Sequence, residues 1–332
     1  MEDRNPLVRR LSAVRAMRKR RRLASGPHRR NRTIAVVPTL FTMGNLISGF
    51  AAIHYAAKPL EFTGPWGWSS LTLAGLLVFL GMFLDSVDGS VARLMRTSSE
   101  VGAQLDSLAD VVTFGVAPAF MMLQLVSHYV GPAGERVGSV IIGPEADTVY
   151  AKLLWAVAAT YVCCTGLRLA RFNVDTTSNS DHLWFSGLPS PGAAGCVASL
   201  IIMHQHWLAA KDVSVGEVSQ TFARMVAFGI PFITLLCALT MVSNIPYVHF
   251  TNRYVQGRKS YSYVARAVVI LALAVWIPQI VFALAFTVYA LSGPIRMIRL
   301  RLSGRPLVTS STSHEATVLV QDQNDNQNLD HV

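Results

Sequence analysis

The chain has 332 residues, of which 52% are hydrophobic and only 14% are charged. This composition excludes an ordinary soluble domain and is typical of a helical bundle in a membrane. Apolar runs long enough to cross a bilayer as a helix lie at about 35–57, 69–95, 102–126, 149–168, 190–209, 223–243 and 264–292. The sequence therefore predicts an all-α polytopic membrane protein.

The amino-terminal tail accounts for the net charge of +10. Residues 1–32 hold twelve basic side chains against Glu2 and Asp3. Because basic segments beside membrane spans stay in the cytoplasm, we predict a cytoplasmic tail over 1–33. The tail is also suited to binding anionic membrane lipids. We expect no nucleic acid partner, since no aromatic residues or folded binding module accompany the charge.

Basic residues also orient the later spans. They follow the second and fourth apolar runs as Arg93, Arg96, Arg168 and Arg171. By the same rule these ends face the cytoplasm. We therefore expect a multi-pass protein of the cell (inner) membrane with its functional groups at the cytoplasmic side.

The last apolar run, 264–292, is basic on both flanks and contains Pro278. A single crossing would place one basic flank outside, whereas two short helices meeting at Pro278 would return both flanks to the cytoplasm. We predict this helical hairpin. The expected organisation after the tail is a six-span core over 34–245, the hairpin over 246–294, and a basic, then polar and disordered tail over 295–332.

Four aspartates lie near the facing ends of the second and third predicted spans, at Asp85, Asp88, Asp106 and Asp110. Within each pair a spacing of three or four residues puts both carboxylates on one helical face. If the chain folds back near Thr97, the two pairs lie at one depth. An uncompensated carboxylate in a membrane costs about 2.5–3.5 kcal/mol, so a cation is needed. Carboxylate ligands favour Mg²⁺ or Mn²⁺, and two such ions could clamp a phosphoryl group.

The residues from Asp85 to Asp110 also resemble the signature of the CDP-alcohol phosphatidyltransferase family, D-x-x-D-G-x-x-A-R-x8-G-x-x-x-D-x-x-x-D. The resemblance covers about 38–245. It implies a six-helix membrane core, often dimeric, that binds CDP-diacylglycerol with two divalent ions. By position, the four aspartates would be metal ligands and Asp110 also the general base. The residues that would contact CDP-diacylglycerol are Asn45, Gly89, Ala92, Arg93 and Gly102.

Each of these nucleotide contacts has a plainer alternative. Small residues such as Gly89 let helices pack closely. Arg93 is also explained as a topology arginine whose charged group reaches the membrane surface. Apart from the resemblance, Asn45 within the first span is better explained by a hydrogen bond between helices.

Three stretches resemble the phosphatidylserine synthase branch of the family: 106–118, 168–173 and 185–191. This resemblance implies L-serine as the acceptor. Either Arg168 or Arg171 could pair with the serine carboxylate or a lipid phosphate, and the resemblance adds Asn173 to this group. The alternative for both arginines is membrane topology alone. Ser190 is given no role.

Three other functions remain open from the residues. The nearest is the same reaction with glycerol 3-phosphate or inositol phosphate as the acceptor. An aspartate-rich membrane prenyltransferase would also bind Mg²⁺ and diphosphate, but its acid spacing differs and it does not need the glycines, alanine and arginine of this signature. An ion-coupled transporter is disfavoured because transporters tend to carry internal repeats and midplane sites, whereas these aspartates cluster toward one face.

Overall fold

The computed structural model divides into two compact units, Met1–Ala117 and Pro118–Val332, and each is described by itself. The predicted amino-terminal tail lies outside the described residues. Regular structure in the described part is helical, apart from a single antiparallel bridge between Thr63 and Ser69. The structure describes residues 36–59, 62–64, 67–95, 100–130, 149–177, 187–209, 217–245, 247 and 272–303.

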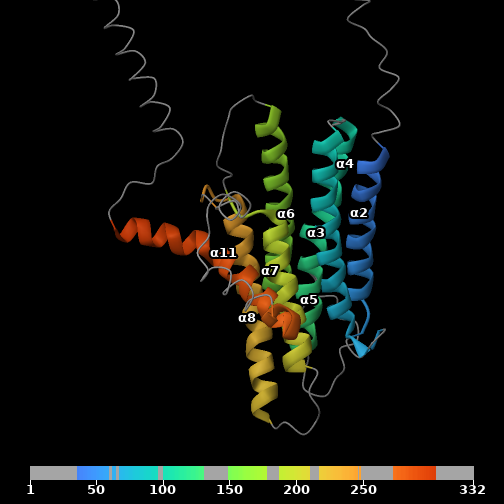
Figure 1. Ribbon diagram of the computed structural model, residues 1–332. Helices are drawn as coiled ribbons and strands as arrows, with labels where there is room; N and C mark the ends of the chain where they lie inside the picture. Colours follow the sequence, from blue (N-terminus) through green and yellow to red (C-terminus); the bar gives the residue numbers. More distant parts are fainter. Residues whose placement is uncertain are drawn as a thin grey trace, which may run out of the picture. The chain divides into compact units, whose positions relative to one another are not determined.

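The first unit is built on two long helices, α2 (Val36–Ala56) and α3 (Ser70–Met95), which lie side by side (Figure 1). Ser48 Oγ on α2 donates a hydrogen bond of 2.7 Å to the backbone oxygen of Leu77 on α3. A small residue such as Gly81 lets the helix backbones approach closely. The unit continues with α4 (Glu100–Asp110), which also packs against α2.

The third predicted span is a helix in three parts. After α4 comes a π-helix, η2 (Val111–Val116), and then α5 (Ala117–Val130). The wider turn is seen in the bond from the backbone N–H of Ala117 to the oxygen of Val112. Hydrophobic periodicity gave no sign of this change in winding.

The second unit contains α6 (Val149–Thr177), α8 (Glu217–Val242), and between them in the chain α7 (Ser190–Met203) with a second π-helix, η3 (His204–Ala209). Nearly every residue of α7 is buried, so α7 is the central helix of this unit. Helix α8 contacts both α6 and α7.

The segment before α7 is fixed to the end of α8. The backbone N–H of Gly187 donates to Ile245 O, and that of Leu188 donates to Thr240 O. Gly187 has a φ of 90°, which favours glycine, and a Cβ there would collide with backbone atoms of Met241. This glycine is therefore needed for the entry into α7.

Five helices of the described part are long and apolar enough to cross a membrane: Ser70–Val91, Val101–His128, Val149–Val174, Thr221–Val242 and Pro278–Arg299. The chain is thus a multi-pass α-helical membrane protein, as predicted. Helix α2 and the α7–η3 segment coincide with the other two predicted runs before residue 245, but neither is among these five.

The carboxyl-terminal helix α11 (Pro278–Leu302) differs in length from the prediction. The chain bends at Ile277, and α11 begins at Pro278, where a missing amide proton is tolerated. However, α11 continues to Leu302, past the predicted end of the hairpin at residue 294, so the basic residues 295–302 are helical. In Figure 1, α11 is inclined to α6, and its red end extends away from the other helices of its unit. Most of the first arm of the predicted hairpin lies outside the described residues.

Candidate active site

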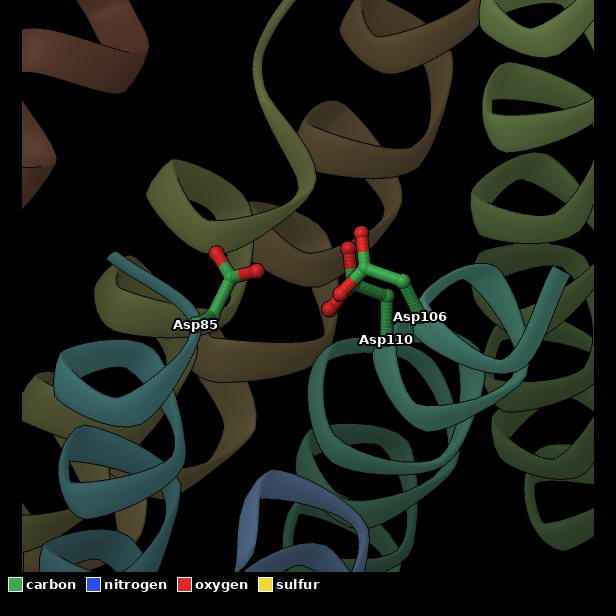
Figure 2. A group of neighbouring side chains, drawn as sticks. All are labelled: Asp85, Asp106 and Asp110. Carbon is green, nitrogen blue, oxygen red and sulfur yellow. The ribbon is translucent and has the colours of Figure 1, made fainter. Parts of the chain in front are cut away.

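Three of the four predicted aspartates converge in the first unit. Asp85 comes from α3, and Asp106 and Asp110 come from α4, with one carboxylate oxygen of each lying within 4.8 Å of the others. Figure 2 shows the three side chains pointing toward one another across the space between the two helices. The fold-back that the sequence predicted therefore brings together acids that are 25 residues apart in the chain (110 − 85).

Asp88 is placed differently from the other three. Its buried carboxylate accepts a hydrogen bond from the hydroxyl of Thr42 on α2. It is not part of the group of three, although it lies within electrostatic range of Asp85 and Asp106. The sequence argument considered only the two acid-bearing helices and missed Thr42, which lies 46 residues away in the chain.

The donor set of the cluster fits a hard divalent cation. Carboxylates this close repel one another unless positive charge or protons compensate them. Oxygen ligands without histidine or cysteine are those that Mg²⁺ and Mn²⁺ prefer. Asp85, Asp106 and Asp110 are therefore suited to holding such an ion.

Asn45 is a neighbour of this cluster on α2 and is completely buried. Its side-chain amide donates a hydrogen bond of 3.1 Å to one oxygen of Asp110. Its backbone oxygen accepts a bond of 3.0 Å from the hydroxyl of Thr113. The hydrogen bond between helices, one of the two alternatives for Asn45, is thus present in the structure, and it is made to a cluster residue.

The other predicted nucleotide contacts lie on the same two acid-bearing helices. Gly89 is exposed on α3, and a Cβ added there would meet no heavy atom of the described residues within 4 Å. Gly102 is half-buried on α4. Ala92 and Arg93 lie near the end of α3, but their side chains are outside the described part of the structure. Within the described part of the chain, no side chain therefore covers the backbone at Gly89 beside the acids.

The predicted acceptor residues lie on α6, in the second unit. Arg168 donates a hydrogen bond of 2.7 Å from Nη1 to the hydroxyl of Ser190, and Arg171 donates one of 2.9 Å to Oδ1 of Asn244. Asn173 is half-buried two residues further along α6. Ser190 is completely buried at the start of α7. Sequence reasoning missed Ser190 and Asn244, because nothing in the sequence indicates pairings across 22 and 73 residues.

Comparison with known proteins shows which family has a sequence like that of this chain. The model of the family described as CDP-alcohol phosphatidyltransferase matches residues 35–245. The chain belongs to the CDP-alcohol phosphatidyltransferase family. The matched region contains all four aspartates and both arginines, and it ends before α11.

Three curated relatives of this chain have the printed name CDP-diacylglycerol--serine O-phosphatidyltransferase. The protein of this name from Helicobacter pylori (strain ATCC 700392 / 26695) is 34% identical over 215 residues, 64% of this chain and 72% of the relative. The Bacillus subtilis (strain 168) protein is 35% identical over 49% of this chain and 74% of its own length. The Methanocaldococcus jannaschii protein is 27% identical over 81% of this chain and 97% of its own length.

Proposed function

We propose that this chain transfers the phosphatidyl group of CDP-diacylglycerol to the hydroxyl of L-serine, giving phosphatidylserine and CMP. The observation that carries the proposal is the convergence of Asp85, Asp106 and Asp110 in a chain of this family. The shared name of its relatives supports serine as the acceptor. Family membership also removes the prenyltransferase and the transporter from the alternatives.

Asp110 is the proposed general base. The serine hydroxyl oxygen forms a bond to the lipid-proximal phosphorus, the bond from that phosphorus to the CMP oxygen breaks, and the hydroxyl proton passes to the carboxylate. Asn45 donates to Oδ1 of Asp110, which fixes the orientation of the group. A partner that orients the base in this way belongs to the usual architecture of proton-transfer sites.

The remaining aspartates serve charge balance and metal binding in this proposal. Asp85, Asp106 and Asp110 would hold a divalent ion, Mg²⁺ or Mn²⁺, and Asp88, oriented by Thr42, would complete a two-ion site. When bound, such ions stabilise negative charge on phosphoryl oxygens and on departing CMP. Without them, the diphosphate of the substrate would be repelled by the four carboxylates.

Arg168 and Arg171 are proposed to bind the serine carboxylate or a lipid phosphate. Ser190 and Asn244 accept hydrogen bonds from them and are neutral, so they orient the guanidinium groups without cancelling their charge. Charge-assisted hydrogen bonds from arginine to carboxylate or phosphate are among the stronger polar contacts in proteins. Asn173 is assigned to the same group. The nucleotide is assigned to Gly89, Ala92, Arg93 and Gly102, with Asn45 acting on this site through its bond to Asp110.

The cellular setting is part of the proposal. The basic ends of the spans support a location in the cell (inner) membrane with the aspartates at the cytoplasmic side. The basic tail over 1–33 is proposed to bind anionic lipids, and the chain is proposed to act as a homodimer, as implied by its family.

The decisive experiment is an acceptor comparison with the purified full-length protein in lipid nanodiscs. CMP release from CDP-diacylglycerol is measured with L-serine, glycerol 3-phosphate or inositol 1-phosphate, each with Mg²⁺ or Mn²⁺ present. Of the three acceptors, only serine is expected to release CMP, together with an equal amount of phosphatidylserine. CMP release with either phosphorylated acceptor but not with serine would overturn the acceptor while leaving the metal cluster in place.

A further inference from the structure

The π-helix η2 starts directly after Asp110. Such wide turns inside α-helices are rare and are frequent at functional sites. Here the wide turn carries three buried residues, Thr113, Phe114 and Gly115. The wide turn therefore lies between Asp110 and Thr113, in a segment that packs against α2.

Thr113 is held between glycines of two other helices. An added Cβ at Gly49 on α2 would stand 2.9 Å from Cα of Thr113 and 3.0 Å from its Cβ. An added Cβ at Gly81 on α3 would stand 2.5 Å from Cγ2 of Thr113 and 2.8 Å from Oδ1 of Asn45. Contacts this short exclude any side chain at either glycine without movement of the backbone or of Thr113. The position of Thr113 is thus fixed from both sides.

The hydroxyl of Thr113 is directed at the residue that holds Asp110. Thr113 Oγ1 donates to the backbone oxygen of Asn45 at 3.0 Å, and Asn45 Nδ2 donates to Asp110 Oδ1 at 3.1 Å. All three residues are buried, with Thr113 and Asn45 completely excluded from solvent. Oδ1 of Asn45 has no hydrogen-bond partner among the described residues. The side-chain amide of Asn45 is therefore oriented by its bond to Asp110, while the hydroxyl of Thr113 holds the backbone from which that side chain projects.

We propose that Thr113 is a positioning residue for the reaction: its hydroxyl fixes Asn45, and Asn45 in turn fixes the carboxylate of Asp110. This inference rests on the proposed function, since it gives Asp110 the roles of base and metal ligand. Groups that orient a metal ligand typically change metal affinity or activity about 10- to 100-fold when they are removed. Thr113 acts through one intermediate residue, so an effect near the lower end, roughly tenfold, is expected.

Two substitutions at Thr113 separate the hydroxyl from the packing of the side chain. Thr113→Val keeps the shape and removes the hydroxyl, whereas Thr113→Ser keeps the hydroxyl and removes the methyl group that touches Gly81. The matched control is Thr234→Val on α8. Thr234 is also completely buried, but among the described residues its hydroxyl bonds only to the oxygen of Ile230 in its own helix.

Two readouts are taken from each purified full-length variant. The first is Mn²⁺ affinity, from the electron paramagnetic resonance signal of free Mn²⁺, which needs no turnover. The second is the separation of kcat from KM in serine-dependent CMP release. Thr113→Val is expected to weaken Mn²⁺ binding roughly tenfold and to lower kcat with little change in either KM, because the chemical step is the one affected. Thr113→Ser and Thr234→Val are expected to behave as the wild type.

The reverse pattern, with Thr113→Ser impaired and Thr113→Val normal, would show that Thr113 only fills space and would overturn the proposal. Equal Mn²⁺ affinity in all variants would overturn it as well. Failure of the proposed function would look different. In that case the wild type releases no CMP with serine, while the Mn²⁺ affinities of the variants still report on Thr113.

Discussion

Gly81→Ala probes the point where α2, α3 and η2 meet beside the aspartates. Gly81 is buried on α3, and an added Cβ would lie 2.5 Å from Cγ2 of Thr113 and 2.8 Å from Oδ1 of Asn45. Thr113 cannot move away easily, because Gly49 contacts it from α2. The methyl group must therefore displace Asn45 or separate the helices.

The size of the effect follows from a comparison with Gly229→Ala. Gly229 lies inside α8, and a Cβ added there meets no heavy atom within 4 Å in the part of the chain that the structure describes. Both substitutions gain the higher helix propensity of alanine, about 1 kcal/mol, but only Gly81→Ala overfills a packed site, which costs about 1–3 kcal/mol. Gly81→Ala should thus be less stable than Gly229→Ala by about 1–3 kcal/mol, since the propensity gain cancels in the difference.

The assay is the free energy of unfolding in mixed micelles, measured by titration with a denaturing detergent, together with kcat for CMP release. Gly81→Ala is also expected to lose activity under conditions in which it remains folded, since it displaces the residue that orients Asp110. If Gly81→Ala were as stable and as active as Gly229→Ala, the close packing of these three helices would be refuted.

Three further predictions concern the second unit and the orientation of the chain. Arg171→Ala should raise the KM for serine about 10- to 150-fold, because a lost charged hydrogen bond is worth about 1.5–3 kcal/mol. A change only in the KM for CDP-diacylglycerol would instead assign Arg171 to a phosphate of that substrate. Gly195→Ala should be less stable than Gly229→Ala by about 1–3 kcal/mol, because its Cβ would lie 2.6 Å from Cδ1 of Phe286 on α11. Phe286→Leu in the same chain should remove this difference, and no rescue would mean that α11 does not pack there. In a cysteine-free background, single cysteines at Ser12 and Ser310 should both resist labelling from outside intact cells. Labelling at 310 alone would mean that the apolar run 264–292 crosses the membrane once and does not form the hairpin.

The helices could be predicted because their signal is local. The apolar runs located both ends of α2 and α3 to within a few residues. They located one end of α6 and of α8, and each of these two helices extends several residues further at its other end. The end of α11 was misplaced because the apolar run stops near 292, while backbone hydrogen bonding continues among arginines whose long side chains can reach the membrane surface. Hydrophobicity therefore locates a span better than it locates the end of a helix.

The acid cluster could be predicted in part. Spacings of three and four residues on two helices that follow each other closely in the chain are enough to bring Asp85, Asp106 and Asp110 together. The bond from Thr42 to Asp88 and the bond from Asn45 to Asp110 depend on how α2 packs against the acid-bearing helices. The winding of η2 depends on the same tertiary contacts. None of these follows from local spacing.

The most direct test of the account is whether serine-dependent CMP release requires a divalent ion bound by the aspartate cluster. Purified wild-type protein and Asp106→Asn are assayed in excess chelator and again after Mg²⁺ or Mn²⁺ is restored, with folding checked by the thermal transition of each. The wild type should lose its activity in chelator and regain it with metal, and Asp106→Asn should stay folded and inactive throughout. Full wild-type activity in excess chelator would contradict the account.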